Sequence, residues 1–250
     1  MKRVLYFGDG TLSTSARYLA GVLTYFRTPF DHVPTARRFT GGALRRGYTL
    51  FILSDYPSKN ISRAIQREIA QKVKEGAGLL MIGGWSSFRG VDGHYRGTPI
   101  GRVLPVAISR QDDRVNARGG ALVYSKKRSP FLKGISFRES PVISGFNRVS
   151  PKSSSRVLLF ARKIIPRYPK VSLEKREYPF LIMGAYGRGK VAALTTDVAP
   201  HWVGSFLDWG RRRVRIKVSK GIQIEVGERY LRFLGRLVKV LQHLDRFGET

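Results

Sequence analysis

Three aspartates each lie just after an apolar segment, where a β-strand is expected to end. Asp9 follows residues 4–7, Asp55 follows 48–53 and Asp197 follows 191–195. In open parallel sheets, ligands bind at the carboxyl ends of the strands, so carboxylates there could bind a cation or the hydroxyl groups of a ligand. Taken singly, an aspartate after a strand more often shapes a turn. Together, the three residues make this edge of the sheet a candidate site.

Two histidines lie in loops after expected strands and add a titratable group to this edge. His94 and His201 could each serve as a general base or a metal ligand, although an exposed or structural histidine is the commoner case. The four histidines show no His-x-His or His-x-x-x-His spacing, which argues against a zinc site, and no metal ligands are assigned. The candidate catalytic residues are therefore Asp9, Asp55, His94, Asp197 and His201.

The apolar segment 78–82 ends in a glycine pair, followed by a tryptophan and two serines. Paired glycines let the backbone come close to a bound group, and a tryptophan beside them could stack on a ligand or simply pack the loop. Ser86 partly matches a nucleophile elbow, but Phe88 occupies the position where the closing glycine is needed. The candidate ligand-binding residues are Gly83, Gly84, Trp85, Ser86 and Trp202.

The elements that must position these residues alternate along the first third of the chain. Strands are expected at 4–7, 30–33, 48–53 and 78–82, and helices with an apolar stripe at 13–26 and 61–74. This alternation predicts an α/β fold with a doubly wound, mostly parallel sheet. Downstream, we expect a strand at 103–108, a hairpin of 180–183 with 191–195, and a terminal helix at 227–244.

Residues 1–250 are expected to form one domain that contains a β-rich, basic insertion at about 111–175. Short β-like runs separated by proline and serine suggest that this insertion faces the surface, and residues 111–120 are expected to be irregular.

The chain has no cysteine, which excludes disulfides, thiolate metal sites and a cysteine nucleophile. Its 46 Lys and Arg against 17 Asp and Glu give a net charge of +29. That charge fits either a nucleic-acid or anionic-surface partner, or an arginine-rich solvated surface. No nucleic-acid-binding motif is present, so nucleic acid is the less favoured partner. Without a membrane-length apolar run or a secretory signal, we expect a cytoplasmic protein that does not enter a membrane.

Several of these segments together resemble the uncharacterised glutamine amidotransferase-like proteins, a branch of the class I amidotransferase-like superfamily. The resemblance extends over nearly all of the chain. It rests mainly on residues 53–57, 80–85, 187–202 and 208–210. It implies a flavodoxin-like three-layer α/β/α sandwich. It also implies that Gly83 and Gly84 correspond to the glycines of the superfamily's oxyanion strand, whose backbone N–H groups would bind an anion or a carbonyl group.

The glutaminase activity of that superfamily does not carry over to this sequence. It requires a cysteine in a Gly-x-Cys-x-Gly elbow and a His-x-Glu pair, and neither is present. The sequence therefore predicts a Cys-less member that binds a small molecule at the carboxyl edge of the sheet and forms a homo-oligomer; no cofactor is identified. Two alternatives stay open: a hydrolase that uses the aspartates and histidines, with or without a metal, on a carbohydrate-like substrate, and a basic scaffold for nucleic acid.

Overall fold

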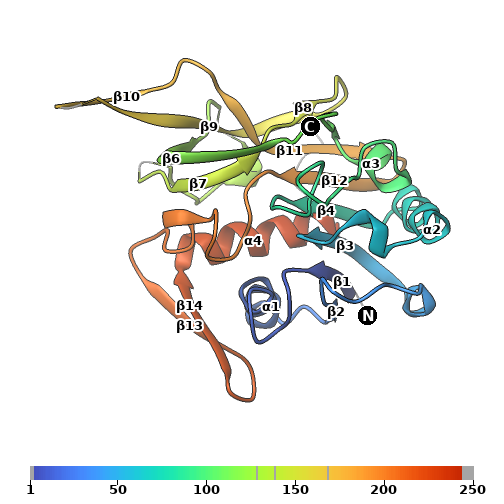
Figure 1. The fold of residues 1–250 in the computed structure, drawn as a ribbon. Helices are drawn as coiled ribbons and strands as arrows, with labels where there is room; N and C mark the ends of the chain where they lie inside the picture. The colour runs from blue at the N-terminus through green and yellow to red at the C-terminus, as the bar shows by residue number, and fades with distance from the viewer. Residues whose placement is uncertain (1–2, 128, 138, 168, 244–250) are drawn as a thin grey trace.

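The computed structural model describes residues 3–243 except 128, 138 and 168. Its centre is a ten-stranded mixed sheet in the order β2-β1-β3-β4-β12-β11-β9-β6-β7, with β10 paired to β9 (Figure 1). The strands of this sheet are β1 Arg3–Gly8, β2 Phe30–Val33, β3 Tyr48–Ser54, β4 Gly78–Ile82, β6 Arg114–Tyr124, β7 Val142–Asn147, β9 Arg156–Arg167, β10 Lys170–Leu173, β11 Tyr178–Tyr186 and β12 Gly189–Leu194.

Five strands, β2, β1, β3, β4 and β12, run parallel and form the half of the sheet that the alternating pattern predicts. Successive side chains of a strand point to opposite faces. Helices α1 Arg17–Tyr25 and α4 Glu228–Leu241 pack on one face of this half, and α2 Arg63–Lys74 and α3 Pro99–Val103 on the other. The predicted α/β fold is confirmed.

The segment 111–175 is β-rich as predicted, but it is not a surface insertion. Its strands β6, β7 and β9 continue the central sheet in antiparallel order beyond β11. Ala121, Val123 and Phe146 are fully buried, because they belong to the same core as α4. Residues 114–120, expected to be irregular, are the first part of β6.

Two local predictions needed correction, and one stretch without a predicted element forms a hairpin. The strand expected at 103–108 is reduced to the two residues of β5 Val106–Ala107, which pair with β8 Ser150–Pro151. Before it lies the short helix α3, which Thr98 caps by accepting the Gly101 N–H at 2.9 Å. Helix α1 begins at Arg17 rather than at residue 13, after a turn closed by Thr11 and Thr14. The basic stretch after residue 210, which had no assigned element, forms a projecting hairpin of β13 Arg213–Ser219 and β14 Ile222–Gly227 (Figure 1).

The predicted hairpin of β11 with β12 and the terminal helix α4 are both confirmed. Short 3-10 turns complete the fold at Gly42–Arg46, Ser58–Asn60, Pro130–Leu132 and Gly204–Phe206. Among the described helices, none has the length and apolar character needed to cross a bilayer.

Candidate functional site

A cavity of about 250 Å3 lies where the parallel strands end. Its wall includes Asp9 after β1, Asp55 after β3 and Asp197 after β12, together with Ser86 and His201. Strands β1, β3, β4 and β12 are neighbours and run in the same direction, so the loops that follow them meet at one edge. The structure thus brings together four of the five candidate catalytic residues.

Asp9 lies at the base of this site and is only 5% exposed. It receives a short hydrogen bond from the hydroxyl of Tyr6, which is itself fully buried. Burial raises the pKa of Asp9 well above its ordinary value, and the negative charge of Asp55 raises it further. Burial and a neighbouring negative charge thus act in the same direction on the Asp9 carboxyl.

The carboxylate of Asp55 lies inside the loop that follows β4. Its Oδ1 accepts the Ser86 N–H at 2.7 Å, and the Asp55 N–H donates to the Ser87 hydroxyl at 3.0 Å. A Cβ on Gly84 would lie 2.1 Å from Asp55 Oδ1, so only glycine leaves room for this carboxylate. Burial raises the pKa of Asp55 to about 6, although the hydrogen bond from Ser86 opposes the shift.

The N–H groups of the glycine pair donate to protein oxygens. Gly83 N–H donates to the carbonyl oxygens of Leu194 at 2.7 Å and Thr196 at 3.1 Å. Gly84 N–H donates at 2.8 Å to Oδ1 of Asn147, a buried side chain at the end of β7. The anion pocket that the resemblance implies at these two N–H groups is therefore not available in this structure.

Asp197 and His201 form an ion pair at the rim. Asp197 Oδ2 lies 3.4 Å from His201 Nδ1 and accepts the Trp202 N–H at 2.9 Å. Asp197 Oδ1 is buried and has no hydrogen-bond partner among the described residues. Burial raises the pKa of Asp197, and the hydrogen bond to Asp197 raises the pKa of His201. The pair thus combines a protonatable imidazole with an acceptor oxygen that is left unsatisfied.

The two tryptophans proposed as ligand contacts differ in their positions. Trp85 is 44% exposed beside His201, with ring centroids 5.4 Å apart, and the Arg114 guanidinium lies 4.6 Å from its ring. Trp202 is buried, and its Nε1–H donates to Asn116 Oδ1 at 2.9 Å, which gives it a packing role. Trp85 is therefore the tryptophan available at the rim.

His94 is the candidate catalytic residue that the structure does not place at the cavity. It is exposed, with a φ of +49°, and its carbonyl oxygen accepts a hydrogen bond from the Ser58 hydroxyl. Within the described part of the chain, no group of three or more His, Asp and Glu side chains is arranged to hold a metal ion.

Sequence reasoning missed two residues that organise the site. Thr35 accepts the Gly10 N–H at 2.9 Å and donates to the Asp55 carbonyl oxygen at 3.0 Å, joining two of the loops. Asn147 bridges Gly84 and the buried carboxylate of Asp113. No local pattern marks Asn147, because only the order of strands in the antiparallel half brings it to β4.

Comparison with known proteins agrees with this fold. A family model described as "putative glutamine amidotransferase" matches residues 48–219. Two cytoplasmic proteins from Salmonella typhimurium superpose over 96% of this chain and 99% of theirs: STM1381 with 25% identity and a TM-score of 0.73, and STM3548 with 23% and 0.72. A putative ThuA-like protein from Parabacteroides merdae, 13% identical, gives a TM-score of 0.55 over 94% of this chain and 88% of its own. No curated protein matches the sequence.

Proposed function

The chain belongs to the GATase1-like family of putative glutamine amidotransferases, and from this premise we propose that it binds a small polar molecule instead of hydrolysing glutamine. The binding site is the cavity at the carboxyl ends of β1, β3 and β12. One observation carries the proposal: three carboxylates and a histidine, from the three loops that follow β1, β3 and β12, line this single cavity.

Loss of the glutaminase reaction follows from the residue types. Glutamine hydrolysis in the superfamily requires a cysteine thiolate, and the sequence contains no cysteine. None of its four histidines is followed two positions later by glutamate, so the usual base is missing as well. The engaged N–H groups of Gly83 and Gly84 leave a tetrahedral oxyanion without these two donors.

The cavity favours a ligand that donates hydrogen bonds. In a chain with 46 Lys and Arg, none of the described residues that line the cavity is basic apart from His201. The carboxyl oxygens of Asp9, Asp55 and Asp197 accept hydrogen bonds from hydroxyl or ammonium groups, and those carboxyl groups that are ionised also repel anions. A volume of about 250 Å3 suits a molecule smaller than most drug-sized ligands. The proposed ligand is therefore a small polyol, sugar or amine.

Calorimetric titration with a panel of monosaccharides, polyols and short alkyl amines tests this proposal, with inorganic phosphate as the anionic comparison. We expect at least one hydroxyl or amine probe to bind and phosphate not to bind at this cavity. Asp197→Asn should weaken binding by at least tenfold, because it converts an unsatisfied acceptor into a neutral amide. Asp92→Asn, an exposed carboxylate paired with Lys59, is the matched control.

Two results would contradict the proposal: unchanged affinity in the Asp197→Asn variant, or no binding of any hydroxyl or amine probe. Release of ammonia from glutamine by the pure protein would overturn the loss of glutaminase chemistry. A cytoplasmic location and a homo-oligomeric state stay predictions; the Salmonella relatives that are named cytoplasmic proteins support the first.

A further inference from the structure

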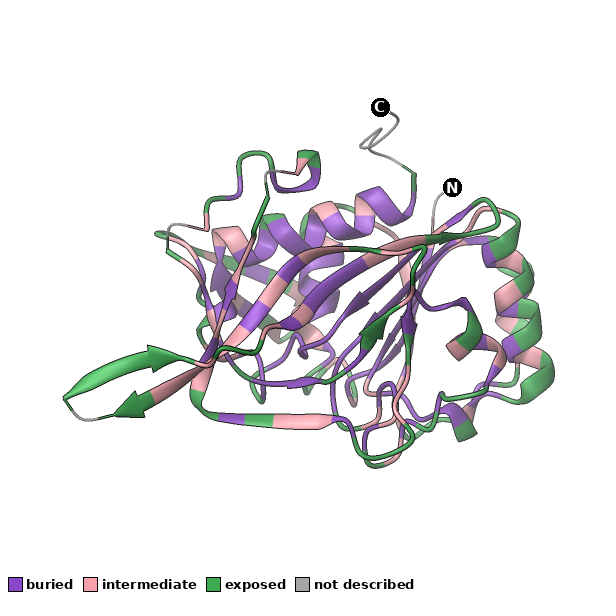
Figure 2. Cartoon of the chain, turned by 90° about the horizontal axis from the view of Figure 1, so that it is seen from above, coloured by how far each residue is buried: buried purple, intermediate pink, exposed green. Residues whose placement is uncertain are grey.

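The antiparallel half of the sheet has one face that no helix covers. Leu159, Ala161 and Val123 point into the core shared with α4 and are fully buried. The residues that alternate with them on β6 and β9 are only half-buried: Leu122, Tyr124, Phe160 and Arg162. Viewed from above, these strands lie in front, with no helix over them (Figure 2). We refer to these four residues with Lys126, Lys127 and Arg156 as the β6–β9 face.

An aromatic pair lies on this face. Tyr124 and Phe160 are directly opposite each other on β6 and β9, with ring centroids 6.1 Å apart and planes inclined by 32°. The Lys126 ammonium lies 4.5 Å from the centre of the Phe160 ring. Next to the pair is a cavity of about 410 Å3, whose lining includes Phe160, Lys126, Lys127 and Arg156. The Lys126 ammonium thus lies over the Phe160 ring, and further cations line the cavity beside it.

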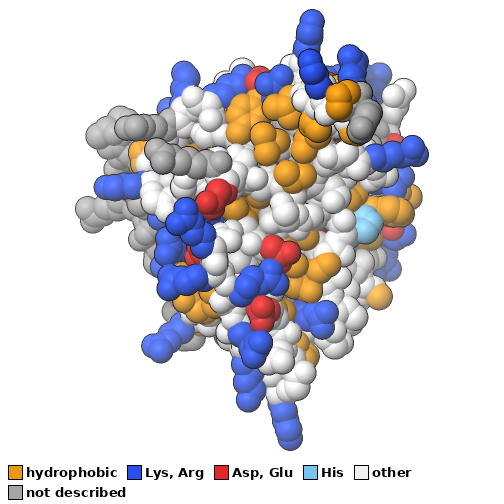
Figure 3. Space-filling model, turned by 90° about the vertical axis from the view of Figure 1, so that its left-hand side faces the viewer, with side chains coloured by type: hydrophobic (Ala, Val, Ile, Leu, Met, Phe, Trp, Pro, Cys, Tyr) orange, Lys and Arg blue, Asp and Glu red, His pale blue; other side chains and the backbone are white. Residues whose placement is uncertain are grey.

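The charge of this face is strongly positive. Glu177 binds both Lys126 and the Tyr124 hydroxyl and so neutralises one cation. Lys127 and Arg156 are exposed and form no ion pair with any described residue. Lys and Arg also spread over the side of the molecule toward which the paired strands β9 and β10 project (Figure 3). A second copy of this chain docking face to face would meet like charges, whereas a polyanion would be attracted.

We propose that the β6–β9 face binds single-stranded nucleic acid. Unstacked bases present flat faces that stack on aromatic side chains of an open sheet, and phosphates between them bind Lys and Arg. Here bases stack on Phe160 and Tyr124, while phosphates contact Lys127 and Arg156. A duplex keeps its bases stacked and cannot use the aromatic pair. The sequence shows no nucleic-acid-binding motif because the two aromatics come from strands far apart in the chain.

Fluorescence anisotropy with labelled oligouridine, oligothymidine and a DNA duplex of equal length tests this proposal over a series of salt concentrations. We expect both single strands to bind more tightly than the duplex. Phe160→Leu should lower single-strand affinity by about tenfold without changing the salt dependence, since one stacked base contributes roughly that factor. Lys127→Gln with Arg156→Gln should reduce the slope of log K against log salt concentration by about 1.4.

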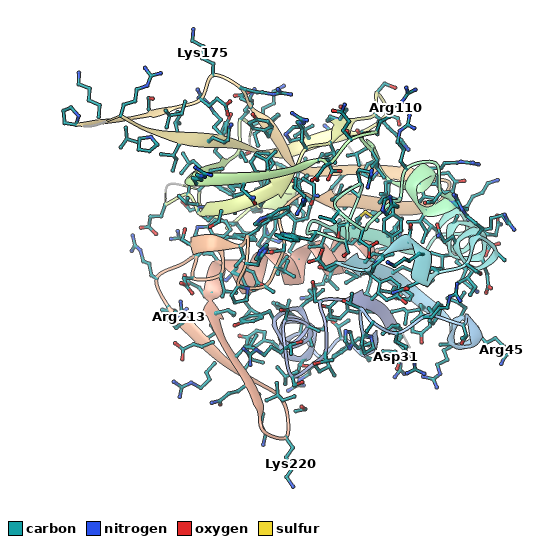
Figure 4. The ribbon with its side chains drawn as sticks, viewed as in Figure 1. Asp31, Arg45, Arg110, Lys175, Arg213 and Lys220 are labelled. Carbon is teal, nitrogen blue, oxygen red and sulfur yellow. The ribbon has the colours of Figure 1, made fainter. Side chains whose placement is uncertain are left out.

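Controls use residues distant from the face. Tyr25→Leu removes an exposed aromatic side chain on α1. Lys220→Gln with Arg45→Gln removes two cations: Lys220 lies at the tip of the β13–β14 hairpin, and Arg45 lies at the right of the view in Figure 4. These variants should bind as the parent does. Tighter binding of oligouridine than of oligothymidine would identify RNA as the natural partner, and the reverse would identify DNA.

Four outcomes would overturn the proposal. Equal affinity for duplex and single strand, or an effect of the control cations as large as that of Lys127 and Arg156, would show a purely non-specific charge effect. A Phe160→Leu variant that melts at the same temperature as the parent and binds single strands equally well would show that bases do not stack on Phe160. A change of oligomeric state in the Lys127→Gln, Arg156→Gln variant without a change in nucleic-acid affinity would assign the face to a second copy. None of these outcomes bears on the cavity proposed above.

Discussion

Replacing Asp55 by asparagine should stabilise the protein at neutral and higher pH. The carboxylate lies buried against the loop after β4, and its pKa is raised to about 6 because burial disfavours its charged form. In the unfolded chain the same group titrates near 3.8. Well below the unfolded pKa the carboxyl is protonated in both states and the burial penalty is absent. The penalty grows as the pH rises between the two pKa values, and well above the folded pKa of about 6 the folded protein carries it in full.

The magnitude follows from the shift. A rise of about two pKa units corresponds to about 3 kcal/mol of destabilisation at pH 8. Asparagine keeps an oxygen that can accept the Ser86 N–H, and the raised pKa already includes the effect of that hydrogen bond on the charged carboxylate. Asp55→Asn also removes a negative charge that raises the pKa of Asp9. We expect a net gain of about 3 kcal/mol in the free energy of unfolding at pH 8.

Urea unfolding of both proteins between about pH 4 and pH 8 measures this gain. The difference in unfolding free energy should be near zero or slightly negative at pH 4 and should grow as the pH rises through the pKa of Asp55. Asp92→Asn, which breaks an exposed ion pair with Lys59, should change stability by less than about 1 kcal/mol. A difference for Asp55→Asn that is independent of pH, or that favours the parent at pH 8, would refute the reasoning.

Two further predictions concern the same loops. Gly84→Ala should lower the free energy of unfolding by about 3 kcal/mol or more, because the new methyl group meets the Asp55 carboxylate at 2.1 Å. Gly97→Ala is the control: this glycine also has a positive φ, but no atom lies within 4 Å of the added methyl group, so the loss should be about 1 kcal/mol. Equal losses in urea unfolding would contradict this prediction. Asp197→Asn should lower the pKa of His201 toward its ordinary value near 6.5, which NMR titration of the imidazole measures. An unchanged His201 pKa would show that Asp197 does not cause the raised value.

The parallel half of the sheet and the meeting of its aspartates could be predicted from local patterns. Residues 4–7 and 78–82 are apolar throughout and 48–53 are apolar except for Thr49, as expected for strands covered on both faces. Once these strands are taken as parallel neighbours, Asp9, Asp55 and Asp197 can only follow them at one edge. What the pattern could not predict is that Asp55 turns inward onto the Ser86 N–H, because that depends on the path of the loop after β4.

The prediction of a surface insertion was wrong because side chains along β6 and β9 point alternately into the core and onto the uncovered face. In β6 and β9, apolar residues such as Leu122 and Phe160 on the uncovered side stand among Arg and Lys, so the segments look like surface hairpins. Their pairing connects residues far apart in the sequence, and the same pairing places Asn147 against Gly84. Long-range pairing of this kind leaves little local trace.

The acidity of the cavity is best understood against the charge of the whole chain. With a net charge of +29, arginines or lysines near the cavity would neutralise its carboxylates and remove the cost of burying them. Instead His201 is the single basic side chain among the described residues of the lining; it pairs with Asp197, and its charge lowers the pKa of Asp55 only in part. Burial keeps the pKa values of Asp9 and Asp55 raised. Unrelieved burial of carboxylates lowers stability, and a ligand that donates hydrogen bonds to them would recover part of that loss, as expected for a binding site.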